Sequence, residues 1–199
     1  MIKIKNLNKK KPYRLFKDYL KKAIASNQPT VDAICISSFN KNKNEVSSRF
    51  VNLKYIYDEE WIFFSNYESN KANDFNTHDQ ISAIFYWNQT DVQIRIKANI
   101  FKTHSELSDE HFFSRSPKKN AIALSSQQSR LISSYEKVLN NFKNKLNDKN
   151  SLSVRPDNWG GYSFKPYYFE FWEGNEYRIN KRQVFVKEGN SWKAYFLQP

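Results

Sequence analysis

The segment from Val92 to Ala98 constrains the fold more than any other part of the chain. Its apolar residues alternate strictly with Gln93, Arg95 and Lys97, which is the pattern of a strand with one face in the core. Other short runs, rich in β-branched and aromatic residues, predict further strands. We expect them over residues 33–39, 46–57, 61–65, 81–87, 162–172, 176–182, 183–187 and 192–197. Most of these runs are joined by short polar turns, which favours an antiparallel sheet.

Helices are expected at the margins of this sheet. Apolar spacing after Pro12 predicts an amphipathic helix that ends near Pro29, and a short helix is expected over 69–75. Two capping-box spacings, which begin at Thr103 and Ser133, predict helices that run to about residues 115 and 146. Many short strands, without regular strand–helix alternation, predict a mainly β fold: a closed or nearly closed barrel with peripheral helices.

Length and composition predict one domain over residues 12–199, preceded by a flexible basic segment at 1–11. The net charge of +12 is compatible with nucleic acid, an anionic membrane or phosphorylated metabolites. Because the lysines are scattered and no recognition motif is present, the sequence does not favour nucleic acid. The chain shows no secretory signal or long apolar segment, so a cytoplasmic location without membrane contact is expected.

Metal and disulfide chemistry are not indicated. Cys35 is the only cysteine, so no internal disulfide can form, and the three histidines lack the spacing of metal ligands. We also find no nucleophile set of the Ser/His/Asp or Cys/His kind and no glycine-rich phosphate loop. If the protein is an enzyme, a bound cofactor is therefore expected to carry the chemistry.

Several segments carry side chains suited to an anionic aromatic ligand. In the 46–57 run, Arg49 and Lys54 stand at the two ends of one stretch, although charges on an edge strand are the alternative explanation. Ser69 to Lys71 marks a helix start, where free N–H groups attract phosphate. A plain helix cap is the alternative there. Further cations lie at Arg115 to Lys119.

The segment 169–182 has the composition of a strand, a tight Gly-Asn turn and a second, cationic strand. Its Trp172 can cover a ring, and its Arg178 and Arg182 can bind phosphate through two parallel hydrogen bonds. The alternative is a surface hairpin with the tryptophan in the core, and the local pattern alone favours that alternative.

Taken in order, these segments resemble the pyridoxine (pyridoxamine) 5′-phosphate oxidase family. The resemblance extends from Pro12 to the C-terminus. The matching pieces are Ser48–Lys54, Phe64–Asn66, Ser69–Lys71, Gln93, Ser114-Arg115, Gln128-Ser129, Trp159–Gly161, Glu170–Trp172, Arg178, Arg182 and Leu197–Pro199.

This resemblance implies a split β-barrel homodimer with FMN at the subunit interface. The cofactor-binding residues that it implies are Arg49, Phe50, Val51, Asn52, Leu53, Lys54, Phe64, Ser65, Asn70, Lys71, Gln93, Gln128, Ser129, Trp172 and Arg182. It also implies oxidation of a B6 phosphate to pyridoxal 5′-phosphate, with O2 as acceptor and H2O2 as product.

The substrate-binding residues implied by the resemblance are Lys54, His111, Arg115, Lys119, Arg178 and Asn180, with Arg178 as the catalytic residue over the substrate ring. Four positions depart from the family pattern: Asn70 replaces an arginine, His111 a tyrosine, Lys119 a serine and Asn180 a histidine.

Two other features, Phe85-Tyr86-Trp87 and the final Leu-Gln-Pro, resemble the phenazine-biosynthesis branch of the same superfamily. Two alternatives therefore stay open. One is an FMN oxidase of the same fold with another substrate, such as a phenazine precursor. The other is a non-enzymatic basic module that binds nucleic acid or only flavin.

Overall fold

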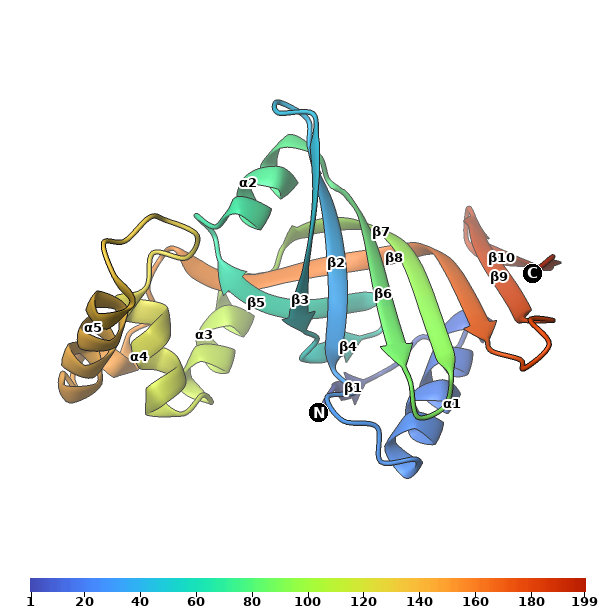
Figure 1. Cartoon of the computed structure of the whole chain (residues 1–199), viewed down its shortest axis with the longest axis horizontal. Coiled ribbons are helices and arrows are strands. Elements are labelled where there is room, and N and C mark those ends of the chain that lie inside the picture. The colour runs from blue at the N-terminus through green and yellow to red at the C-terminus, as the bar shows by residue number, and fades with distance from the viewer.

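The computed structural model describes residues 1–199 and contains one sheet of ten strands with five α-helices around it (Figure 1). The strands are β1 Lys3–Lys5, β2 Ala33–Asn40, β3 Glu45–Asn52, β4 Tyr55–Tyr57, β5 Glu60–Asn66, β6 Gln80–Trp87, β7 Val92–Lys102, β8 Trp159–Glu173, β9 Lys181–Glu188 and β10 Ser191–Leu197. The helices are α1 Lys11–Ala25, α2 Asn70–Thr77, α3 Ser105–Phe113, α4 Pro117–Ser125 and α5 Tyr135–Asn147, and a 3-10 turn spans Ser151–Ser153.

The mainly β fold is confirmed, but the sheet is open. The strand order is β1-β4-β5-β8-β7-β6-β2-β3, with β9 and β10 attached beside β8. The end strands β1 and β3 do not pair with each other, so no barrel closes. All pairs are antiparallel except β1 with β4, which is parallel. The 15-residue β8 organises the sheet, because β7 pairs with it over residues 162–173, while β5 pairs with its start and β9 with its end.

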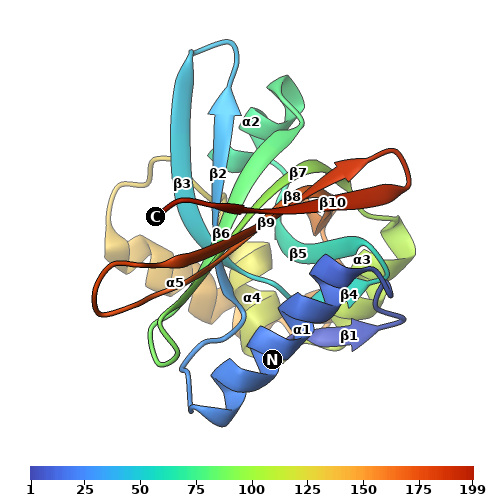
Figure 2. The ribbon, with the colours of Figure 1, turned by 90° about the vertical axis from the view of Figure 1, so that its right-hand side faces the viewer.

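Aromatic side chains fill the core between α1 and the inner face of the sheet. Tyr13 and Phe16 of α1 are fully buried, and the Phe16 ring lies 4.4 Å from the Trp61 ring of β5. Figure 2 shows α1 beside β1 and β4. Helices α3, α4 and α5 gather at the opposite end of the molecule from the β9–β10 hairpin (Figure 1). No helix is long and apolar enough to span a membrane.

Two predicted strands are wrong in detail. The run predicted over 46–57 breaks at Leu53 and Lys54, because the amide of Leu53 turns away to donate to the Asp32 carbonyl at 2.8 Å. The strand predicted over 176–182 begins only at Lys181, so a loop replaces the tight turn.

This loop, residues 174–180, has a local cause. The Gly174 amide donates to the Asp91 carbonyl at 2.9 Å, and a side chain at Gly174 would collide with the Asp91 carboxylate. The Asn175 side chain accepts from the Tyr177 amide, and Arg178 adopts a φ of 61°. Residues 174–180 therefore form turns and cannot extend β9 toward β8.

The helix starts also differ from prediction. α3 is capped by His104 rather than by Thr103, and the α5 cap is Ser134, whose hydroxyl accepts from the Lys137 amide at 3.2 Å. α4 was not predicted, and neither was β1. The expected flexibility of residues 1–11 stays a prediction, although Lys3–Lys5 of that segment pairs with β4.

Candidate functional site

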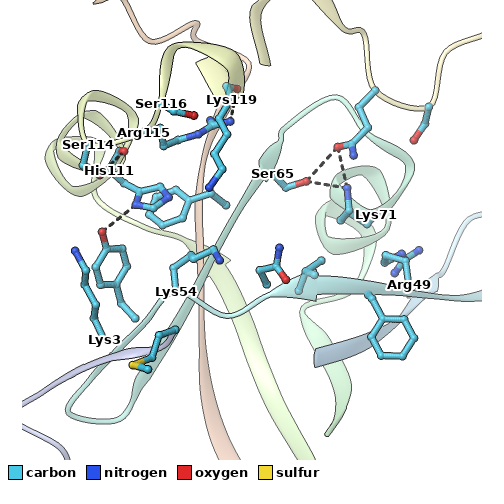
Figure 3. A pocket seen from close by; sticks show the side chains of 18 of the residues that line it. Lys3, Arg49, Lys54, Ser65, Lys71, His111, Ser114, Arg115, Ser116 and Lys119 are labelled. Carbon is cyan, nitrogen blue, oxygen red and sulfur yellow. Dashed lines mark hydrogen bonds between the residues drawn. The ribbon is translucent and has the colours of Figure 1, made fainter. Parts of the chain in front are cut away.

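A cavity of about 860 Å³ lies between β3, β5, α2 and the α3–α4 region (Figure 3). This volume is within the range of small-molecule sites. No carboxylate lines the cavity, whereas five lysines and arginines of the predicted site and Lys3 do. It brings together many of the predicted residues: Arg49, Phe50, Val51, Asn52, Lys54, Phe64, Ser65, Asn70, Lys71, His111, Arg115, Lys119, Gln128 and Ser129. The cavity is therefore built for an anion.

Lys71, in the first turn of α2, is a buried ammonium without a carboxylate partner. Its Nζ donates to the hydroxyls of Ser65 and Ser69 at 2.7 and 2.9 Å and to Gln128 Oε1 at 3.0 Å. Burial, together with the nearby Arg49 charge, lowers the pKa of Lys71 to about 8. An anion bound beside Lys71 would supply the missing negative charge.

Arg49 of β3 lies at the same end of the cavity and is oriented by α2. Its Nη1 donates to Ser38 Oγ at 2.6 Å, and its Nη2 lies 3.4 Å from Asp74 Oδ2. Asp74 is itself held by Ser38 and by Asn40, at 2.6 and 3.0 Å. No local pattern indicated Asp74, because its side-chain contacts are to residues 25 or more positions away.

A second group of cations lines the other end of the cavity (Figure 3). Lys54 follows β3, and its Nζ lies 2.9 Å from Asp32 Oδ2. Burial raises the pKa of Asp32, but the hydrogen bond and the charge of Lys54 lower it more, so the pKa lies below its usual value. Lys119, in the first turn of α4, accepts from Arg115 through its carbonyl group.

Arg115 is a partly buried cation without a carboxylate partner. Its guanidinium lies 4.3 Å from the centre of the Trp159 ring. Burial lowers the pKa of Arg115 to about 10, and its buried Nη1 has no hydrogen-bond partner. A buried donor without a partner is costly, so an anion here would stabilise the site.

His111 is a neutral hydrogen-bonding group in this structure. Its ring stacks on Phe64 with centroids 3.8 Å apart, and its Nδ1 lies 2.9 Å from the Tyr55 hydroxyl. Burial, followed by the charges of Arg115, Lys54, Lys3 and Lys119, lowers the pKa of His111 to about 4. It therefore brings a ring nitrogen, not a charge, to the cavity at neutral pH.

The remaining predicted residues lie outside this cavity. Gln93, Trp172 and Arg182 form a row across β7, β8 and β9, where each faces the next in the ladder. Arg178 and Asn180 belong to the loop at 174–180. The Leu53 side chain is fully buried in the core.

The row is anchored by Glu170, a buried residue of β8. Its carboxylate lies 2.8 Å from Arg182 Nη2 and 3.0 Å from Arg95 Nη1, and it accepts from the Tyr168 hydroxyl at 2.9 Å. One chain therefore presents two separate groups of predicted site residues.

Comparisons with known proteins identify the family. Residues 159–199 match the pyridoxine 5′-phosphate oxidase C-terminal dimerisation region. A pyridoxine/pyridoxamine 5′-phosphate oxidase of Leptospira interrogans is 31% identical over 196 residues, covering 94% of this chain and 88% of the relative. The Cytophaga hutchinsonii protein of the same name is 33% identical over 193 residues, with the same coverage.

Among solved structures, PhzG from Burkholderia lata 383, in complex with tetrahydrophenazine-1-carboxylic acid, superposes with a TM-score of 0.87. It is 26% identical, and the match covers 95% of this chain and 93% of PhzG. Since two relatives exceed 30% identity over nearly the whole chain, this protein belongs to the pyridoxine/pyridoxamine 5′-phosphate oxidase family and is a flavin-dependent oxidoreductase.

Proposed function

We propose that this protein binds FMN and oxidises pyridoxine 5′-phosphate or pyridoxamine 5′-phosphate to pyridoxal 5′-phosphate, with O2 as acceptor and H2O2 as product. The observation that carries the proposal is the arrangement of the cavity, which has a cation group at each end and no lining carboxylate. Such a cavity suits two ligands that each carry a phosphate and an aromatic ring.

The donor set at the α2 end fits the phosphate of FMN. Arg49 and Lys71 are held in place before any ligand arrives, and Ser65, Gln128 and Ser129 add polar groups beside them. Residues 50–54 would then flank the flavin ring. The chemistry that FMN supplies when bound is hydride acceptance from the C4′ carbon of the substrate and reoxidation by O2.

The opposite end fits the phosphate of the substrate. Lys54, Arg115 and Lys119 bring three positive charges, and only Asp32 lies within ion-pair distance of them. Arg115 contributes the unpartnered Nη1, and the neutral His111 ring contributes a hydrogen-bonding nitrogen. These residues would hold the substrate through its phosphate, with its ring toward the middle of the cavity.

The two separate groups of predicted residues support a homodimer. Gln93, Trp172 and Arg182 lie away from the cavity of their own chain, so a second copy would have to bring them to it. Large apolar side chains are exposed where such contacts could form, including Phe50 of β3 and Phe196 of β10, which are 74% and 65% exposed. β10 also lies within the matched dimerisation region.

A turnover assay tests the proposal. Purified protein loaded with FMN is mixed in air with each B6 phosphate, and pyridoxal 5′-phosphate and H2O2 are followed together. We expect both products in equal amounts, because each hydride removed reduces one O2. A protein that takes up no FMN would contradict the cofactor assignment.

A second candidate is an FMN oxidase with a tricyclic substrate, and the likeness to PhzG favours it. It predicts a yellow protein that oxidises neither B6 phosphate but reduces its flavin when given a reduced phenazine precursor. The same assay therefore separates the two candidates.

A further inference from the structure

We propose that Lys3 of β1 is a further anion-binding residue of the substrate pocket, and that it makes the pocket selective for a phosphate dianion over a carboxylate. This inference rests on the proposed function, because it assigns the Lys54 end of the cavity to the substrate. Neither sequence pattern nor the resemblance pointed to Lys3.

The parallel pairing of β1 with β4 places Lys3 at the pocket. The Lys3 amide donates to the Lys54 carbonyl at 2.9 Å, and Lys3 faces Tyr55 in the ladder. Ile2 is buried and Ile4 packs against the core. Because side chains alternate along a strand, the two isoleucines direct Lys3 to the opposite face, where it lines the cavity (Figure 3).

Lys3 is a cation without a counter-ion. It forms no ion pair, and its Nζ lies 5.8 Å from the centre of the Tyr55 ring. Lys54, by contrast, is partly neutralised by Asp32 at 2.9 Å. The Met1 amino group lies 3.5 Å from the same carboxylate, so Lys54 and Met1 share Asp32. Lys3 therefore adds a further, unpaired positive charge at this end of the cavity.

The selectivity follows from Coulomb's law. The attraction of one lysine for a ligand is proportional to the ligand charge, so a dianion gains about twice the free energy that a monoanion gains. Removal of the lysine charge should weaken the binding of both ligands. The fold-change in Kd for the monoanion is then about the square root of the fold-change for the dianion. A pocket with an additional cation thus favours a phosphate monoester over a carboxylate.

The test replaces Lys3 with methionine, which keeps most of the length of the side chain and removes its charge. The matched control is Lys5→Met, because Lys5 is exposed on the same face of β1 but lines a different hollow beside Tyr57, Asp58 and Glu60. Affinities are measured on FMN-loaded protein at about pH 8, where a phosphate monoester is dianionic. Pyridoxal 5′-phosphate and pyridoxal are followed by the flavin difference spectrum, and inorganic phosphate and acetate by calorimetry.

For Lys3→Met we expect about tenfold weaker binding of pyridoxal 5′-phosphate and of phosphate, about threefold weaker binding of acetate, and unchanged binding of pyridoxal. Lys5→Met should change each affinity less than about twofold, because Lys5 faces a different hollow whose carboxylates, from Asp58, Glu59 and Glu60, offset its charge. Equal affinities of the two variants for phosphate would overturn the inference, and so would equal losses for phosphate and acetate.

The outcome also separates this inference from the proposed function. If the wild-type protein binds phosphate, and Lys3→Met weakens that binding, but no B6 compound binds, then the substrate assignment fails while Lys3 stands. If the wild-type protein binds neither phosphate nor a B6 phosphate, both the inference and the proposed function are overturned. Equal thermal midpoints of the variants confirm that folding is unchanged.

Discussion

Replacing Arg178 with alanine is expected to lower kcat/KM for a B6 phosphate by about 100-fold, which corresponds to about 2.7 kcal/mol of transition-state stabilisation. The Arg178 side chain forms no hydrogen bond or ion pair within its own chain, and it extends from the loop at 174–180. Because Arg178 lies outside the cavity of its own chain, the partner copy of the proposed homodimer would bring its guanidinium over the substrate ring, where it would hold C4′ in position for hydride transfer. Its loss should therefore affect turnover and leave the FMN affinity within about threefold.

The control for Arg178→Ala is Lys181→Ala, which removes a nearby exposed charge that pairs with Glu173 at 2.6 Å. This control should keep turnover within about twofold, because exposed ion pairs contribute little. Stopped-flow reduction of the bound flavin measures the chemical step, and flavin fluorescence on dilution measures retention. Loss of flavin from Arg178→Ala, with normal turnover of the remaining holoenzyme, would show that the assignment is wrong.

Replacing Arg49 with alanine is expected to have the reverse effect. The FMN dissociation constant should rise by about 30-fold, or about 2 kcal/mol, because a charge-assisted hydrogen bond to the phosphate is lost. Turnover of the protein saturated with FMN should change little. The affinity for riboflavin, which lacks the phosphate, should be the same in both proteins.

The affinity for riboflavin shows whether Arg49 binds the FMN phosphate or only stabilises the fold. Arg49 pairs with the buried Asp74, so its removal leaves that carboxylate without a cation and can disturb α2. A structural effect would weaken FMN and riboflavin equally, and that result would contradict the assignment. Arg14→Ala, which removes an exposed arginine of α1, controls for the change in net charge.

Local patterns predicted most of the strands, because alternation reports which face of a strand is buried. β7 and β6 lie where their apolar residues indicate. Such patterns could not predict that β8 pairs with three strands, since this pairing depends on the register of strands that are distant in the sequence. The loop at 174–180 was missed because its cause is a contact with Asp91, more than 80 positions away.

The candidate site shows the same limit. The resemblance predicted site residues in several separate segments, and the structure gathers many of them around one cavity. The residues that orient them, Asp32, Tyr55 and Asp74, come from other parts of the chain and had no local signal. Lys3 was missed because a short strand that pairs in parallel leaves almost no trace in the sequence.

The hydroxyl and amide cage around Lys71 has a consequence for handling the protein. Because the pKa of Lys71 is about 8 before an anion binds, part of the protein carries a neutral lysine in mildly alkaline buffer. Phosphate bound beside it would raise that pKa again, so cofactor loading should be accompanied by proton uptake. FMN affinity should then fall by up to tenfold per pH unit between about pH 8 and the raised pKa. Purification in alkaline buffer would therefore strip the flavin, and neutral buffer with FMN would restore it.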